Sequence, residues 1–186
     1  MSFLDELQPQ DRALVISLPY RVGIWISHAD DTGGEEASLE EKAALANIID
    51  GFTREVFGSE AVQHIMMETL QAKNEWEGWA HNYKTILEDA QKAVDILNEV
   101  IDPKEVSAYR QRLFEIAEAV ALAFREYDAL NLQEKLRIYM TYHVKKITAS
   151  KKKAQTLRPI NEYLNVSVKE RMHLRKLADV LTLDYH

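Results

Sequence analysis

The chain has 186 residues, enough for one domain with a substantial buried core. An apolar fraction of 46% with only 6 Gly and 4 Pro favours a compact, helix-rich protein over a disordered one. The absence of cysteine excludes disulfides, thiolate metal ligands and cysteine nucleophiles.

The net charge of −7 is unevenly distributed. Residues 1–130 carry 11 basic and 25 acidic side chains, whereas residues 131–186 carry 12 basic and 5 acidic ones. The basic part is therefore expected to dock on an acidic surface, in this chain, in a second copy as a homodimer, or in a protein partner. We expect no nucleic-acid partner, because no reading motif accompanies the modest basic excess.

The N-terminal residues carry acids where a secretory signal carries Lys or Arg. No run approaches the roughly 20 apolar residues that a bilayer span requires. We therefore expect a cytoplasmic protein without a transmembrane segment.

Helical periodicity dominates the chain. It predicts helices at 10–29, 38–57, 60–76, 79–101, 103–127, 131–149, 156–164 and 168–181. The expected fold is a single-domain all-α bundle of about seven to eight helices over residues 1–186, joined by short loops. Pro19 removes a backbone hydrogen bond from the first helix, where we expect a kink or break.

Apolar side chains that recur every three or four residues mark the faces expected to be buried. One stripe runs from Trp79 through Tyr83 and Ile86 to Ile101, and a second from Val106 through Tyr109 to Phe124. A looser stripe is formed by Leu39, Ala43, Ala46, Ile49 and Val56, with Phe52 beside it. The segment EWEGW (75–79) is expected to be a helix–helix corner with its two Trp rings in the core.

Several helix starts match a capping box, in which a Ser, Thr, Asp or Asn is followed three residues later by Glu. The pairs are Ser38 with Glu41, Asp102 with Glu105, Asn131 with Glu134, and Ser167 with Glu170.

An acidic turn, SHADDTGGEEASLEEK (27–42), contains six carboxylates. Residues 22–45 and 118–138 both run from an apolar helix through an acidic loop to a capped helix, which suggests an internal duplication. Two such hairpins would place their loops at one end of the bundle.

The acidic turn has two interpretations. Oxygen ligands suit Ca²⁺ and Mg²⁺, and an imidazole among them also admits Mn²⁺ or Zn²⁺. The candidate ligands of such a divalent-cation site are His28, Asp30, Asp31 and Glu41, with Glu126, Asp128 and Glu134 from the second hairpin. The alternative is structural, because Glu41 belongs to a capping box and acids at a helix start complement its dipole. The acidic turn does not match an EF-hand loop that begins at Asp30, because Glu35 occupies the position that needs glycine.

ISHADDTGGEEASLEEKAALANII and AEAVALAFREYDALNLQEK resemble the TerB-like (tellurite-resistance protein B) superfamily of all-α domains. The resemblance covers about residues 10–147 and leaves 148–186 as a basic helical extension. It implies acidic residues gathered between hairpins, metal binding, and a role in stress or tellurite resistance. The matching positions are Asp30, Glu41, Glu126 and Glu134. The usual Asp-Gly is replaced by Asp30–Asp31, and the second copy has no glycine.

Catalytic motifs are not evident: the chain has neither a Gly-x-Ser-x-Gly elbow nor a phosphate-binding loop. A di-iron bundle needs two Glu-x-x-His motifs, and only Glu170–His173 is present. We therefore expect a non-enzymatic protein that binds a divalent cation or, alternatively, a metal-free interaction or dimerisation module.

The basic stretch 145–159 is expected to be a solvated helix end, to dock an acidic partner, or to touch anionic lipid peripherally.

Overall fold

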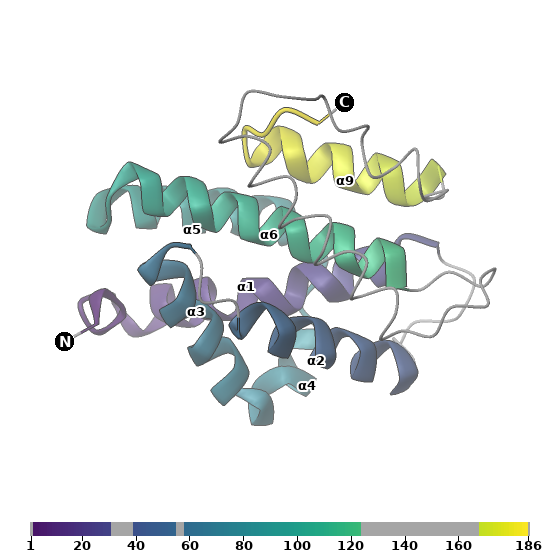
Figure 1. Cartoon of the computed structure of the whole chain (residues 1–186), viewed down its shortest axis with the longest axis horizontal. Helices are drawn as coiled ribbons and strands as arrows, with labels where there is room; N and C mark the ends of the chain where they lie inside the picture. The colour runs from purple at the N-terminus through teal and green to yellow at the C-terminus, as the bar shows by residue number, and fades with distance from the viewer. Residues whose placement is uncertain (1, 31–38, 55–57, 124–167, 186) are drawn as a thin grey trace.

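The computed structural model describes residues 2–30, 39–54, 58–123 and 168–185, and these form an all-α bundle without a strand (Figure 1). The predicted single-domain, all-α fold is therefore confirmed. The α-helices are α1 (Pro9–Ser27), α2 (Leu39–Thr53), α3 (Glu60–Gln71), α4 (Trp76–Ala80), α5 (Ile86–Val100), α6 (Pro103–Ala123) and α9 (Val168–Val180). Short 3₁₀ turns are η1 (Phe3–Asp5), η2 (His28–Asp30) and η3 (Lys73–Glu75).

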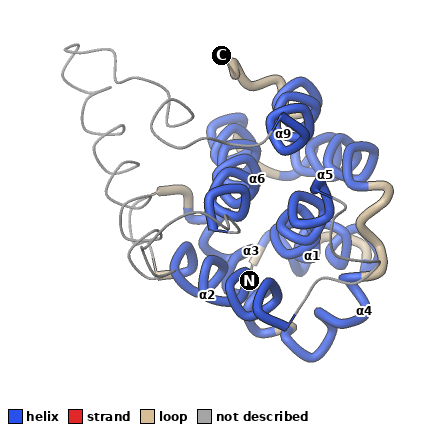
Figure 2. Tube along the Cα trace, turned by 90° about the vertical axis from the view of Figure 1, so that its right-hand side faces the viewer, coloured by secondary structure: helices blue, strands red, loops and turns tan. Residues whose placement is uncertain are grey.

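The helix α1 is the centre of the bundle, and α2, α3, α4, α5, α6 and α9 all pack against it (Figure 2). Every side chain from Ser17 to Ile26 is buried. A helix that is buried on all sides has no polar face. This explains why the run ISLPYRVGIWIS is almost wholly apolar.

Of the kink or break predicted at Pro19, the break is wrong, because α1 continues through Pro19 to Ser27. Proline has no N–H, so the carbonyl of Val15, four residues earlier, receives no helical hydrogen bond. The hydroxyl of Tyr109 in α6 donates to that carbonyl at 3.0 Å. The neighbouring helix thus satisfies the group that proline leaves without a donor, and the helix tolerates the proline.

The chain between α3 and α5 differs from the prediction. The expected helix 60–76 ends at Gln71, and the expected helix 79–101 begins only at Ile86. Between them, α4 is a corner whose Trp76 is buried and stacks on Tyr20, with ring centroids 4.5 Å apart. The indole N–H of Trp76 donates to the carbonyl of Thr69 at 2.9 Å, close to the end of α3. The expected corner is confirmed for Trp76, whereas Trp79 is half-buried.

The predicted buried face of α2 is confirmed for Ile49 and Phe52 and wrong for Leu39 and Ala43. Leu39 is 85% exposed and Ala43 is exposed as well. The residues that face the core are Ala44, Leu45, Ile48, Ile49 and Phe52. The apolar run AALANII permits several faces, so contact with α1 decides which one is buried. The stripe of α6 from Val106 to Val120 is buried as predicted.

Glu105 is not part of the predicted capping box with Asp102. Its carboxylate accepts hydrogen bonds from the backbone N–H of Ala61, at 2.8 Å, and from the hydroxyl of Ser59. The Ser59 hydroxyl in turn accepts from Val62 N–H. Glu105 therefore caps the start of α3, a neighbouring helix. Ser38, Ser167 and the pair Asn131–Glu134 lie outside the described residues.

Candidate functional site

The acidic turn follows a tightly packed helix pair. The helices α1 and α2 run antiparallel beside each other, so the end of α1 and the start of α2 lie at the same end of the bundle (Figure 1). Gly23 permits their close approach, because a Cβ there would lie 2.9 Å from Cδ2 of Leu45 and closer still to Cδ1. The end of α1 and the start of α2 are therefore held at fixed positions by core packing.

His28 lies where α1 passes into η2, at the start of the acidic turn. Its ring stacks on Tyr83, with centroids 4.3 Å apart and planes at 14°. Its backbone N–H donates to the carbonyl of Ile24 and so continues the helical pattern. The imidazole is thus oriented by Tyr83, which comes from the segment between α4 and α5.

The structure describes the side chains of only two predicted ligands, His28 and Glu41. Glu41 lies in the first turn of α2 and is half-buried. Asp30 ends η2, but only its backbone is described. Asp31, Glu126, Asp128 and Glu134 lie outside the described residues, as does most of the second hairpin. Within the described part of the chain, no three His, Asp or Glu side chains are grouped so that they could hold a metal ion. The seven-residue site stays a prediction.

The Glu-x-x-His pair of α9, Glu170 and His173, takes part in packing contacts within the bundle. The ring of His173 lies against Trp25 of α1, with centroids 4.7 Å apart, and its Nδ1 is 3.0 Å from the carbonyl oxygen of Lys169. Glu170, in the first turn of α9, is buried. His173 therefore helps to attach α9 to α1.

A buried arginine is the main polar feature that the sequence analysis missed. Arg21 of α1 donates from Nε to the carbonyl oxygen of Asn82 at 2.8 Å and from Nη2 to Asp89 at 2.5 Å. It is only 6% exposed. Its signal in the sequence is one cation inside an apolar run, and that pattern does not reveal the partner. Arg21 therefore links the segment 81–85 and the first turn of α5 to α1.

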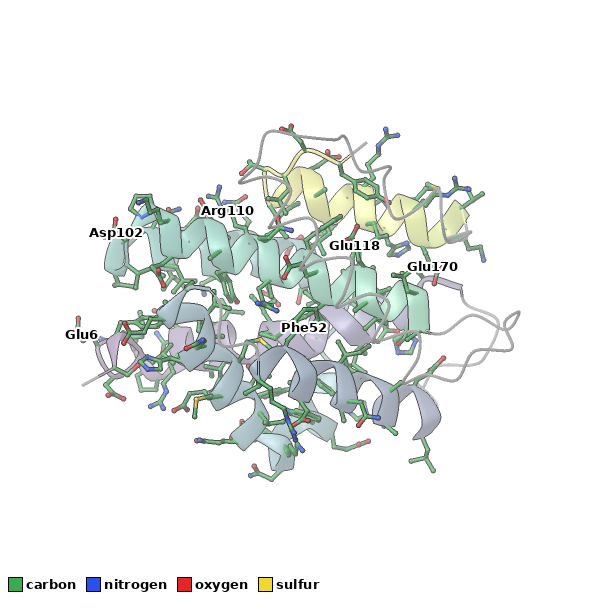
Figure 3. The ribbon with its side chains drawn as sticks, in the orientation of Figure 1. Glu6, Phe52, Asp102, Arg110, Glu118 and Glu170 are labelled. Carbon is green, nitrogen blue, oxygen red and sulfur yellow. The ribbon has the colours of Figure 1, made fainter. Side chains whose placement is uncertain are left out.

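A second charged group lies along α6. The guanidinium of Arg112 lies over the ring of Phe52, 4.4 Å from its centroid, and Arg112 Nε is 3.6 Å from a carboxylate oxygen of Glu115. Glu118, one turn further, is buried (Figure 3). Arg112 and Glu115 are half-buried and Glu118 is buried, so we assign these groups to structure and not to ligand binding.

The outer face of α9 is the most basic surface of the described helices. It consists of Val168, Lys169, Arg171, Met172, Arg175 and Lys176, all exposed, which we name the cationic ridge. Val168 and Met172, four residues apart, form its apolar centre and are 65% and 55% exposed. Arg171 and Arg175 flank this centre on one side, and Lys169 and Lys176 on the other. None of these four cations forms a salt bridge with a described residue.

Comparison with known proteins gives no relative: no family model, no curated protein and no solved structure matches the chain. The TerB-like resemblance is accordingly a prediction from the residues alone. Among the described helices, none has the length and apolarity needed to cross a membrane.

Proposed function

We propose that this chain is a non-enzymatic, TerB-like binding protein that holds a divalent cation at the acidic turn between α1 and α2. The observation that carries the proposal is the fixed position of His28, stacked on Tyr83 directly before the run of carboxylates. Glu41 supports it from the first turn of α2, because α1 and α2 are neighbours. A preorganised imidazole beside carboxylates suits Mn²⁺ or Zn²⁺, and the oxygens alone suit Ca²⁺ or Mg²⁺.

The resemblance to TerB extends this proposal to the biological role. It supports a cytoplasmic protein that acts in stress or tellurite resistance through the cation that it binds.

The test is thermal unfolding in the presence of Ca²⁺, Mg²⁺, Mn²⁺ or Zn²⁺, one at a time, after treatment with a chelator. A cation at 100 times its dissociation constant adds about 2.7 kcal/mol to the free energy of unfolding. The double substitution Asp30→Asn with Asp31→Asn should abolish the increase. The matched control is Asp95→Asn with Glu99→Gln, which removes two exposed carboxylates from α5. A flat response to all four cations, or an equal response of both double variants, would exclude the site.

A second candidate function is favoured by the cationic ridge. Four exposed cations that form no salt bridge with a described residue surround an apolar centre, and such a surface suits contact with an acidic surface. We therefore propose as the alternative a metal-free interaction or dimerisation module, whose partner is an acidic protein or a second copy. Peripheral contact of the basic C-terminal part with anionic lipid belongs to the same alternative. Binding that survives a chelator and weakens with salt would distinguish it from the cation-binding role.

A further inference from the structure

A groove lies at the end of the molecule where the chain begins. Its walls are η1 and the start of α1 on one side and the end of α3 with η3 on the other, and its volume is about 590 Å³. This is within the size range of ligand-binding pockets. Its apolar lining includes Leu4, Leu7 and Ile16, and Ala13 is exposed at its wall.

The lining of this groove is acidic. Asp5, Glu68 and Glu75 contribute carboxylates, and Arg12 contributes the one basic side chain among the lining residues. Arg12 is engaged by two of these acids, at 2.8 Å from Glu68 and 3.8 Å from Asp5. Glu75 is exposed and forms no salt bridge with a described residue. We name this feature the acidic groove.

We propose that the cationic ridge of one copy docks into the acidic groove of a second copy of this chain. The two surfaces are complementary in charge and in the position of their apolar side chains. The ridge presents apolar Val168 and Met172 between cations, and the groove presents apolar side chains beside carboxylates. Burial of the two exposed apolar side chains supplies attraction, and the flanking charges fix the orientation. The inference rests on the interaction role proposed above and does not require a bound cation.

The contact must form between molecules, because the two surfaces lie far apart in one copy. Glu6, next to the groove, and Glu170, in α9, are at opposite ends of the molecule (Figure 3). Each copy therefore keeps a free groove and a free ridge after one contact forms. Such head-to-tail association gives a ring if its rotation closes and an open chain if it does not.

A flat anionic membrane fits the ridge less well. Asp179 is exposed and lies seven residues after Met172, so it shares the same face of α9. A bilayer that covers this face would also meet the Asp179 carboxylate, whereas a groove can contact the two N-terminal turns alone.

The experiment measures self-association of the full chain by sedimentation velocity over a range of concentrations, with a chelator present. The ridge variant is Arg171→Glu with Arg175→Glu, and the groove variant is Ala13→Lys with Glu75→Lys. All four positions are exposed, so folding should be retained, and circular dichroism checks it. The matched control is Lys92→Glu with Lys104→Glu, which changes the charge by the same amount as the ridge variant, on α5 and α6.

We expect the wild-type chain and the control to associate, and the dissociation constant to rise about tenfold or more between about 0.05 M and 0.5 M salt. Each variant alone should stay monomeric. The ridge variant has a ridge without net charge, because the two introduced glutamates then offset its two lysines. The groove variant has a groove with a net positive charge, which repels its basic ridge. Their mixture should associate, since the groove variant keeps the natural ridge and the ridge variant keeps the natural groove.

Three results would overturn the proposal: a monomeric wild-type chain, association that the ridge variant leaves unchanged, or a mixture that remains monomeric. Ridge-dependent binding of a monomeric chain to an acidic protein would replace the second copy as the partner and leave the interaction role standing. Ridge-dependent binding to vesicles that contain phosphatidylserine would replace it with a membrane.

Discussion

The hydroxyl of Tyr109 in α6 donates to the carbonyl of Val15 in α1, the carbonyl that Pro19 deprives of its helical donor. A proline inside the most buried helix is thereby compensated by a side chain that lies 94 residues from that carbonyl in the sequence. Tyr109 is 1% exposed, and burial raises the pKa of its phenol well above the usual value, so the donor stays protonated.

Substitution Tyr109→Phe should lower the free energy of unfolding by about 1–3 kcal/mol, because it leaves the buried carbonyl of Val15 without a partner. The measurement is urea denaturation. Pro19→Ala restores the backbone N–H that can bond to Val15, so Tyr109→Phe should cost less in that background. Equal costs in the two backgrounds would contradict the coupling between Pro19 and Tyr109.

Alkaline pH should destabilise the fold through two buried tyrosines. Burial, helped by the Glu77 carboxylate, raises the pKa of Tyr20 to about 12, and burial raises the pKa of Tyr109 further. Below a pH of about 10, the folded and the unfolded chain both keep the two phenol protons, and the contribution of both tyrosines to stability is fully present. Above it the unfolded chain ionises first, so stability falls by up to about 1.4 kcal/mol per pH unit for each tyrosine.

Urea denaturation at a series of pH values from about 9 upward measures this loss. Tyr20→Phe and Tyr109→Phe should each make the decline with pH shallower, and for Tyr20 the loss should end near pH 12. The slope is compared, and not the absolute stability, because Tyr109→Phe also removes a hydrogen bond. An unchanged slope in both variants would refute the assignment.

Gly23 sets the distance between α1 and α2. Gly23→Ala should cost about 1–3 kcal/mol of stability, because the new methyl group meets Leu45, which is 1% exposed and cannot move into solvent. Leu45→Ala alone should cost about 2–5 kcal/mol through the cavity that it leaves. In the double variant the methyl group introduced at position 23 occupies part of that cavity. The two costs should then sum to more than the loss measured for the double variant, and simple additivity would argue against the contact.

Periodicity in the sequence predicts helices well where a single face is apolar. The α6 stripe is an example: Val106, Tyr109, Leu113 and Ala117 are all buried. Where the run is apolar on several faces, as in α2, packing determines which face is buried, and Leu45 of α2 lies against Gly23 of another helix. A pattern of residue types cannot contain that information.

Contacts between distant residues account for the other differences. The bond from Tyr109 to Val15 keeps α1 intact at Pro19, and Glu105 caps α3 instead of its own helix. Each uses a residue that sequence reasoning assigned to its local surroundings. Prediction of the candidate cation site from the sequence is limited for the same reason. His28 is oriented by Tyr83, whose position relative to α1 depends on the fold.

Arg21 offers the sharpest test of how the fold holds the segment between α4 and α5. Arg21→Met should cost about 3–5 kcal/mol, since it removes the buried partner of Asp89 and the donor to the Asn82 carbonyl. Asp89→Asn should cost less, because the amide still accepts a hydrogen bond and the Asn82 contact remains. Hydrogen exchange should report faster exchange of the amides at the start of α5 in the Arg21 variant, with the centre of α6 affected only through the global loss. A uniform increase in the exchange rate across the described helices would mean that Arg21 supports the whole bundle and not the segment between α4 and α5 in particular.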